Sequence, residues 1–230
     1  MQYALLTVAA ILVATGTRRV QLLRSVGLTK RARRLYLVMA WTIGLLALLA
    51  MAAQVLMLWL CGLLSWRSAL PLHLCSMMGL LTLPMLVLEK RWLWHIALYA
   101  GMPGALLALV FPAVQRVPWM SAMLLAFHTL HTAVALAPLL PLLTGETPDP
   151  LGTLNAAAFL CVLALCALPV NRVTGGNYLF LQLPVPGTPL AALASHGLSA
   201  YRLSLAALAC ACLALEGLCA YAASRARRRR

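Results

Sequence analysis

Basic clusters, prolines and turn residues divide the chain into seven long apolar segments. A helix needs about 20 apolar residues to cross the hydrocarbon core of a bilayer. Most of the segments reach that length, the first is near the lower limit, and the second is long enough to tilt. The segments cover approximately residues 2–17, 35–64, 69–88, 92–111, 119–143, 153–170 and 200–222. This pattern predicts an all-α, polytopic membrane helix bundle of about seven transmembrane helices, forming a single domain over residues 1–230.

The composition points to membrane lipids as the partner rather than nucleic acid. Hydrophobic residues make up 63% of the 230 residues and charged residues only 10%, whereas soluble domains carry about a quarter charged residues. Lys and Arg outnumber Asp and Glu by 18 to 4, which gives a formal net charge of +14. Because most of this charge lies in loops and the tail, it is expected to set topology and to contact anionic headgroups. The oligomeric state stays open.

The positions of the basic residues predict the orientation in the membrane. With the N-terminus outside, all but four of the 18 Lys and Arg residues fall on the inner side, the exceptions being Arg67, Arg116, Arg172 and Arg202. The positive-inside rule therefore favours a multi-pass protein with N-out/C-in topology and a basic cytoplasmic tail at 223–230. Six spans, without the first segment, is the alternative. The Pro- and Gly-containing stretch 171–199 is expected to form an outer re-entrant or loop segment.

Titratable side chains inside the apolar segments are the candidate functional residues, because each costs roughly 2.5–3.5 kcal/mol to insert. His73 and Cys75 lie near the outer end of the third segment, and His128 and His131 lie in the outer half of the fifth. Residues three apart share a helix face, so the second pair does, whereas residues two apart on a helix point to opposite sides. A nucleophilic Cys75 would therefore take its base from the fifth segment.

Simpler explanations exist for the same residues. A lone Cys near a helix end usually packs as a small apolar side chain, and a histidine within a span often forms a hydrogen bond between helices. His95 follows Trp92 and Trp94 and is expected in the interfacial aromatic belt. Zinc could use His73, Cys75 and the later histidines by ligand type, but their spacing matches no zinc pattern, so neither a metal nor another cofactor is expected.

The acidic residues exclude some classes of membrane protein. Glu89, Glu146, Asp149 and Glu216 all lie near the inner face in this topology. No carboxylate lies midway along a segment, which argues against a proton- or cation-coupled transporter with an acidic relay.

Two stretches resemble a known family. The string LPLHLC at 70–75 and the stretch Asn171…Asn177-Tyr178-Leu179-Phe180-Leu181 resemble the YwaF-like family of bacterial integral membrane proteins, and the HxxH pattern at 128–131 matches more weakly. That family is distantly similar to the eukaryotic transmembrane protein 164 family, ether-phospholipid acyltransferases proposed to use a membrane-embedded Cys and His. The resemblance implies an acyl-transfer site in a bacterial plasma membrane. In those proteins the Cys directly precedes the His, whereas here the thiol follows it by two residues.

These observations predict a lipid acyltransferase or lipid-ester hydrolase with a Cys/His site in the outer half of the bilayer. Cys75 would be the nucleophile, His128 or His131 the base, and His73 an orienting or oxyanion partner. The residues expected to shape the pocket or hold a phosphate lie around the outer segment: Asn171, Arg172, Asn177, Tyr178 and Arg202. Arg172 and Arg202 could equally be interfacial anchors. The alternative is a non-enzymatic membrane protein that binds or transports a lipid or small ligand.

Overall fold

The computed structural model describes residues 2–68, 70–185, 187–188 and 190–228, and over these residues it contains helices and no strand. The longer helices are α1 (Gln2–Ser25), α2 (Thr29–Leu60), α3 (Leu74–Leu88), α6 (Met120–Leu136), α8 (Gly152–Thr174) and α10 (Leu198–Arg228). The shorter elements are α4 (Arg91–Ile96), the π-helical turn η1 (Ala97–Gly101), α5 (Met102–Val110), α7 (Leu139–Leu143), η2 (Tyr178–Phe180), α9 (Leu190–Leu193) and η3 (Ala194–His196).

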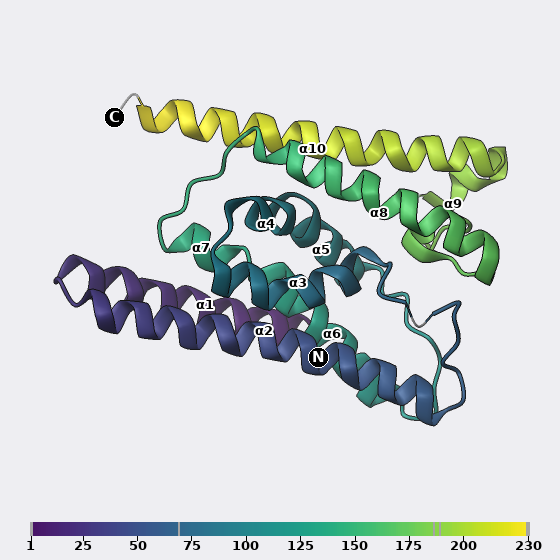
Figure 1. Ribbon diagram of the computed structural model, residues 1–230, viewed down its shortest axis with the longest axis horizontal. Helices are drawn as coiled ribbons and strands as arrows, with labels where there is room; N and C mark the ends of the chain where they lie inside the picture. Colours follow the sequence, from purple (N-terminus) through teal and green to yellow (C-terminus); the bar gives the residue numbers. More distant parts are fainter. Residues whose placement is uncertain (1, 69, 186, 189, 229–230) are drawn as a thin grey trace.

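Most of the long helices extend between the two ends of the molecule, which lie at the left and the right of Figure 1. The α1–α2 turn, the α3–α4 turn and the C-terminal end of α10 lie at one end, which we call the basic end because it carries Arg24, Lys90 and Arg91. The start of α3, the end of α8 and α9 lie at the other, called the loop end after residues 175–197.

Among the described residues, six helical stretches are long and apolar enough to cross a membrane: Ala4–Ser25, Thr29–Leu60, Arg91–Val110, Met120–Leu143, Gly152–Thr174 and Leu198–Ala226. Helix α3 has only 15 residues and is a shorter apolar helix. The prediction of an all-α membrane helix bundle is confirmed, with six to seven helices of the required kind.

Helix α3 begins later than the apolar run that predicts it. Residues 70–73 are not helical, and His73 occupies the N-cap position with extended backbone angles (φ −81°, ψ 145°). Pro71 keeps the helix from extending back to Leu70, because it disfavours helical angles at the preceding residue. The sequence predicts that His73 and Cys75 point to opposite sides of one helix. That prediction is wrong for His73, because His73 has an extended backbone and lies before the helix.

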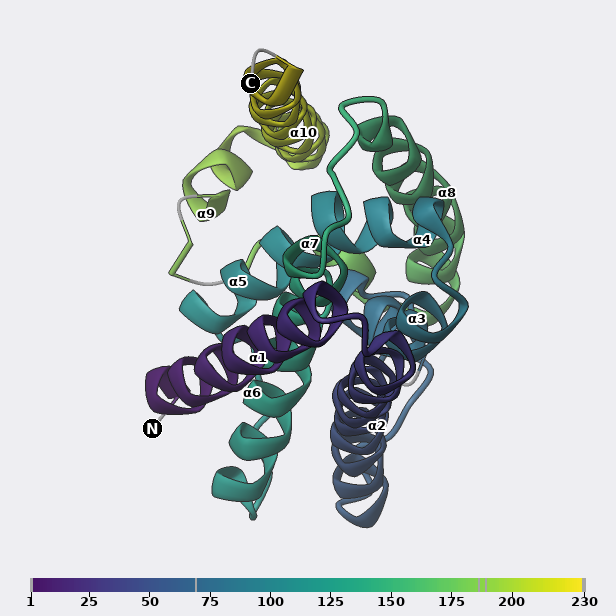
Figure 2. The same ribbon diagram turned by 90° about the vertical axis from the view of Figure 1, so that its left-hand side faces the viewer.

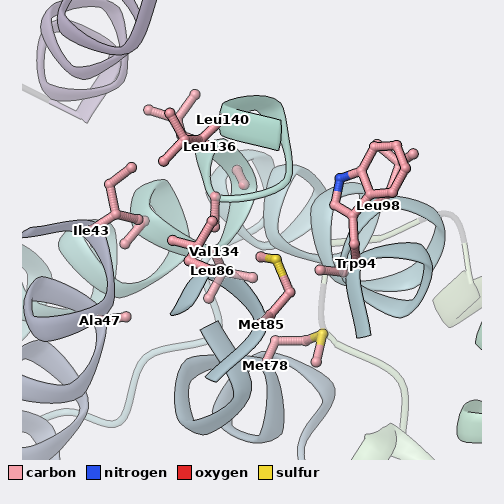
Figure 3. Close-up of a cluster of buried hydrophobic side chains, with 14 of the residues drawn as sticks. Ile43, Ala47, Met78, Met85, Leu86, Trp94, Leu98, Val134, Leu136 and Leu140 are labelled. Atoms are coloured by element: carbon pink, nitrogen blue, oxygen red, sulfur yellow. The ribbon is translucent and has the colours of Figure 1, made fainter. Parts of the chain in front are cut away.

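The two central stretches are enclosed by the other helices. Of the most apolar part of Met120–Leu143, 78% is buried, and of Arg91–Val110, 61%, against 11% for Leu198–Ala226. Figure 2 shows α8 and α10 on one side and α1 and α2 on the other, with α3, α4 and α5 between them. The core in Figure 3 draws on α2, α3, α4, η1, α6 and α7 through Ile43, Ala47, Met78, Met85, Leu86, Trp94, Leu98, Val134, Leu136 and Leu140.

Glycines let α3 approach its neighbours closely, as small residues do between membrane helices. A Cβ placed on Gly44 of α2 would lie 2.6 Å from Cβ of Leu83 in α3. A Cβ placed on Gly79 of α3 would lie 2.9 Å from Cδ1 of Leu130 in α6. These contacts fix α3 between α2 and α6, which positions the first turn of α3 for the candidate site.

Prolines shape the two central stretches. Pro103 cannot donate to the carbonyl of Tyr99, and in the turn before it the amide of Met102 donates instead to Ala97, five residues back, which widens that turn. Pro138 follows α6 and separates it from α7. The stretch predicted over 119–143 therefore consists of two helices in sequence.

Candidate functional site

The imidazole of His73 lies against two aromatic rings from the loop end. Its ring centroid is 5.3 Å from that of Tyr178 and 5.2 Å from that of Phe180, both tilted. The residue is partly exposed, and its ring nitrogens form no hydrogen bond with the residues that the structure describes. Aromatic packing therefore positions His73 while both nitrogens stay available to a ligand.

Reciprocal hydrogen bonds fix Tyr178 beside His73. The side-chain amide of Asn171 donates to the carbonyl of Tyr178 at 3.0 Å, and the amide of Tyr178 donates to Oδ1 of Asn171 at 2.7 Å. The Tyr178 hydroxyl donates to the carbonyl of Trp66 at 2.8 Å and accepts from the amide of Leu70 at 3.1 Å. Tyr178 thus joins the end of α8 to the segment that leads into His73.

Two other predicted binding residues also make hydrogen bonds within the loop end. Oδ1 of Asn177 accepts from the amides of Gln182 and Leu183 at 2.9 and 3.1 Å, and its side-chain amide donates to the Leu183 carbonyl. Arg202 donates to the Leu181 carbonyl at 2.8 Å and to Oε1 of Gln182 at 2.9 Å. These contacts give Asn177 and Arg202 a structural role that sequence patterns do not reveal.

Arg172 differs from these residues. It is exposed near the end of α8 and forms no hydrogen bond or ion pair with the described part of the chain. Its guanidinium is therefore available to bind a phosphate.

Leu179 and Phe180 have a strained backbone that is held in place by a buried tyrosine. Leu179 and Phe180 have φ values of 54° and 55°, a left-handed conformation that costs a non-glycine residue roughly 1–2 kcal/mol. The hydroxyl of Tyr201, a residue only 1% exposed, donates to the Phe180 carbonyl at 2.7 Å. Such strain persists only where surrounding contacts hold it, and it is concentrated at functional sites. Sequence reasoning missed Tyr201, whose role depends on this distant carbonyl.

Cys75 lies in the first turn of α3. It is partly buried, packs against the hydrophobic core, and makes no hydrogen bond to a described residue. Cys75 is four residues before Gly79, so both lie on one face of the helix. Because a Cβ on Gly79 would lie 2.9 Å from Cδ1 of Leu130 and 3.6 Å from the sulfur of Met51, this face of α3 is directed toward both α6 and α2.

His131 is held in one tautomer. Its Nδ1 is 2.7 Å from the carbonyl of Phe127, and since a carbonyl only accepts, we assign the proton to Nδ1 and a lone pair to Nε2. Its ring stacks on the Phe127 ring at 4.0 Å. His128 stands edge-on to the same ring at 5.5 Å, and its buried Nδ1 has no partner among the described residues. Both histidines are 5% exposed.

Cys75 and His131 lie on two helices, α3 and α6, that pack against each other. The two helices run parallel, since Gly79 lies against Leu130 while Met85 and Thr144, further along, line one cavity at the basic end. Cys75 on α3 and Phe127 on α6 each lie about one helical turn before the contact between Gly79 and Leu130. The His131 ring points back to the Phe127 carbonyl, as helical side chains do.

The four residues do not form a closed catalytic or metal centre. No hydrogen bond joins Cys75 to an imidazole within the described ranges. In the same ranges, no group of three or more His, Cys, Asp or Glu side chains could hold a metal ion.

His95 is buried within the protein, whereas a residue of an interfacial aromatic belt is expected to face lipid headgroups. It is 5% exposed, Nδ1 lies 3.2 Å from the side-chain nitrogen of Asn155, and a Cβ on Gly152 would lie 2.5 Å from its ring. It therefore packs between α4 and α8.

Comparison with known proteins gives a family. The model of the TMEM164 family matches residues 1–216, which include every candidate residue above. No curated protein matches the chain, and no solved structure matches it. The resemblance to the eukaryotic family is thereby supported, and the more specific bacterial YwaF-like assignment stays a prediction. The chain belongs to the TMEM164 family.

Proposed function

We propose that the protein is a membrane-embedded lipid acyltransferase or lipid-ester hydrolase, acting in a bacterial plasma membrane on membrane lipids. One observation carries the proposal: His131 is fixed with a free Nε2 lone pair on α6, the helix that packs against the start-to-middle part of α3, which carries Cys75. A base whose other nitrogen is oriented by a fixed acceptor is the arrangement that activates nucleophiles in hydrolases and acyltransferases.

The reaction needs these side chains, the donor lipid, and a second lipid hydroxyl or water as the acyl acceptor. Nε2 of His131 accepts the thiol proton while the sulfur attacks the ester carbonyl of a donor lipid, giving a thioester. The imidazolium returns its proton to the departing lipid alcohol. A second lipid hydroxyl, or water, then gives its proton to Nε2 and attacks the thioester. The new ester or free acid leaves, and the imidazolium reprotonates the thiolate.

The start of α3 supports the role of Cys75. No side chain caps this helix, so the first-turn amides keep their hydrogen-bond capacity. A helix N-terminus stabilises a thiolate and a developing oxyanion. The His73 imidazole directly before it is the proposed oxyanion or orienting partner. In this proposal Asn171, Asn177, Tyr178 and Arg202 hold the loop end in place, and Arg172 contacts the lipid phosphate.

Lipid profiling tests the proposal. A strain lacking the gene would be complemented with the wild type, Cys75→Ala or Cys161→Ala, the last changing an exposed cysteine of α8 as a matched control. The wild type and Cys161→Ala should restore the lipid profile, and Cys75→Ala should leave it as in the deletion. Identical profiles for all three would contradict the enzyme.

A binding or transport protein is the second candidate, favoured by the absence of a hydrogen bond between Cys75 and any described imidazole. It predicts that Cys75→Ser keeps function while His73→Ala loses it. The enzyme proposal predicts that both variants lose function, so the activity of Cys75→Ser distinguishes the enzyme from the binding or transport protein.

A further inference from the structure

A cavity of about 320 Å³ lies at the basic end, away from the candidate site. Its ten lining residues come from five helices, the α3–α4 turn and the loop after α7: Arg24, Tyr36, Met85, Glu89, Arg91, Trp94, Pro141, Thr144, Gly145 and Glu146. Along α3, Glu89 is fourteen residues beyond Cys75, which corresponds to roughly 20 Å of helix. The cavity is therefore separate from the proposed acyl-transfer site.

The floor and the rim of the cavity differ in character. Tyr36, Met85, Trp94 and Thr144 are buried and form an aromatic and apolar floor, part of which borders the core in Figure 3. The four charged lining residues are exposed and form the rim. A site with an apolar floor and a few polar groups is the usual form of a small-ligand pocket.

The two rim arginines retain most of their hydrogen-bond donors. Arg24 donates from one nitrogen to the Thr144 carbonyl at 2.6 Å, and Arg91 from one nitrogen to the Thr147 carbonyl at 3.3 Å. Neither forms an ion pair with a described residue. Since a guanidinium has five N–H donors in a fixed fork, both can still bind a phosphate.

The two rim acids are not equivalent. Glu89 forms an ion pair with Arg33, which stands outside the cavity lining. Glu146 has no ion-pair partner in the described part of the chain, although its backbone amide is tied to the Pro141 carbonyl at 3.0 Å. The rim thus offers two cations and one carboxylate that have no ion-pair partner among the described residues, which fits a ligand with both a phosphate and an ammonium.

We propose that this cavity binds the phosphoethanolamine headgroup of a membrane phospholipid. Arg24 and Arg91 hold the phosphodiester, and the carboxylate of Glu146 accepts hydrogen bonds from the primary ammonium. A purely anionic headgroup would leave Glu146 facing negative charge, and a quaternary ammonium has no hydrogen to donate to it. The lipid rather than a soluble phosphodiester is the source, because the rim lies at the ends of membrane-length helices, where headgroups are expected.

Native mass spectrometry of the purified full chain tests the proposal. The protein would be exchanged into nanodiscs of phosphatidylcholine with equal parts phosphatidylethanolamine and phosphatidylglycerol, and the retained lipids counted. The wild type should retain phosphatidylethanolamine preferentially. Glu146→Gln should lower its ratio to phosphatidylglycerol by up to about fivefold, the value of one exposed charge pair. Arg24→Gln should reduce retention of both lipids.

Controls make each outcome decisive. Arg116→Gln changes an exposed arginine outside the cavity lining and should leave both the ratio and the amounts unchanged. Unfolding midpoints of all variants would show that the fold is intact. An unchanged ratio in folded Glu146→Gln would overturn the headgroup assignment. Displacement of the lipid by soluble glycerophosphoethanolamine would overturn the lipid as the source. Neither result bears on Cys75 and His131, so this proposal fails or stands independently of the acyl-transfer site.

Discussion

Asn171 and Tyr178 exchange two hydrogen bonds, of 3.0 and 2.7 Å, and both side chains are almost completely buried. This pair closes the chain between the end of α8 and the ring that packs on His73. Both functional groups of the Asn171 amide are used, so neither aspartate nor alanine can replace it without leaving buried polar groups unpaired.

Asn171→Ala should therefore lower the free energy of unfolding by about 2 kcal/mol, the cost of buried backbone groups left without partners. The measurement is the unfolding midpoint in detergent, followed by tryptophan fluorescence. Val173→Ala is the matched control, because Val173 is 87% exposed in the same turn of α8. A shift no larger than that of the control would contradict the assigned role.

Tyr178→Phe removes only the hydroxyl that connects the Trp66 carbonyl with the Leu70 amide. The ring that packs on His73 remains, so we expect a loss of only about 1 kcal/mol in stability. Amide exchange at residues 66–73 should become faster, because these hydrogen bonds hold that segment. Unchanged exchange there would show that other contacts fix the segment.

Leu179 tests whether the left-handed backbone is maintained under strain. A β-branched side chain fits a positive φ worst, whereas asparagine tolerates it. Leu179→Val should lower the unfolding midpoint, and Leu179→Asn should lower it less or raise it, although asparagine is the less apolar residue. The reverse order would mean that burial of the Leu179 side chain outweighs the backbone preference.

Gly44 and Gly79 should respond differently to alanine. At Gly44 the new Cβ would lie 2.6 Å from Cβ and 2.9 Å from Cα of Leu83, so a backbone would have to move, which costs about 1–3 kcal/mol. At Gly79 the nearest atom is the end of the Leu130 side chain, 2.9 Å away, which can rotate. There the gain in helix propensity, about 1 kcal/mol, offsets much of the clash. Equal unfolding midpoints for the two variants would contradict this difference.

The length and apolarity of the segments were sufficient to predict a membrane helix bundle, because few other structures bury such runs. Local details depend on particular residues: Pro71 keeps α3 from reaching Leu70, and Pro138 divides the fifth stretch. The hydrogen bonds of Asn177 and Arg202 could not be predicted, since their partners lie in an irregular loop whose path has no sequence periodicity. The burial of His95 depends on Asn155 and Gly152, residues of another helix.

The central claim is that Cys75 carries an acyl group and that His131 moves its protons. The most direct measurement incubates the purified protein in nanodiscs with a phospholipid bearing an alkyne-tagged acyl chain, then maps the adduct by peptide mass spectrometry. The account predicts a hydroxylamine-sensitive adduct on Cys75, absent from Cys75→Ala, still formed by Cys161→Ala and formed far more slowly by His131→Gln. Failure of the folded wild type to form an adduct, or an adduct mapped to another cysteine, would contradict it.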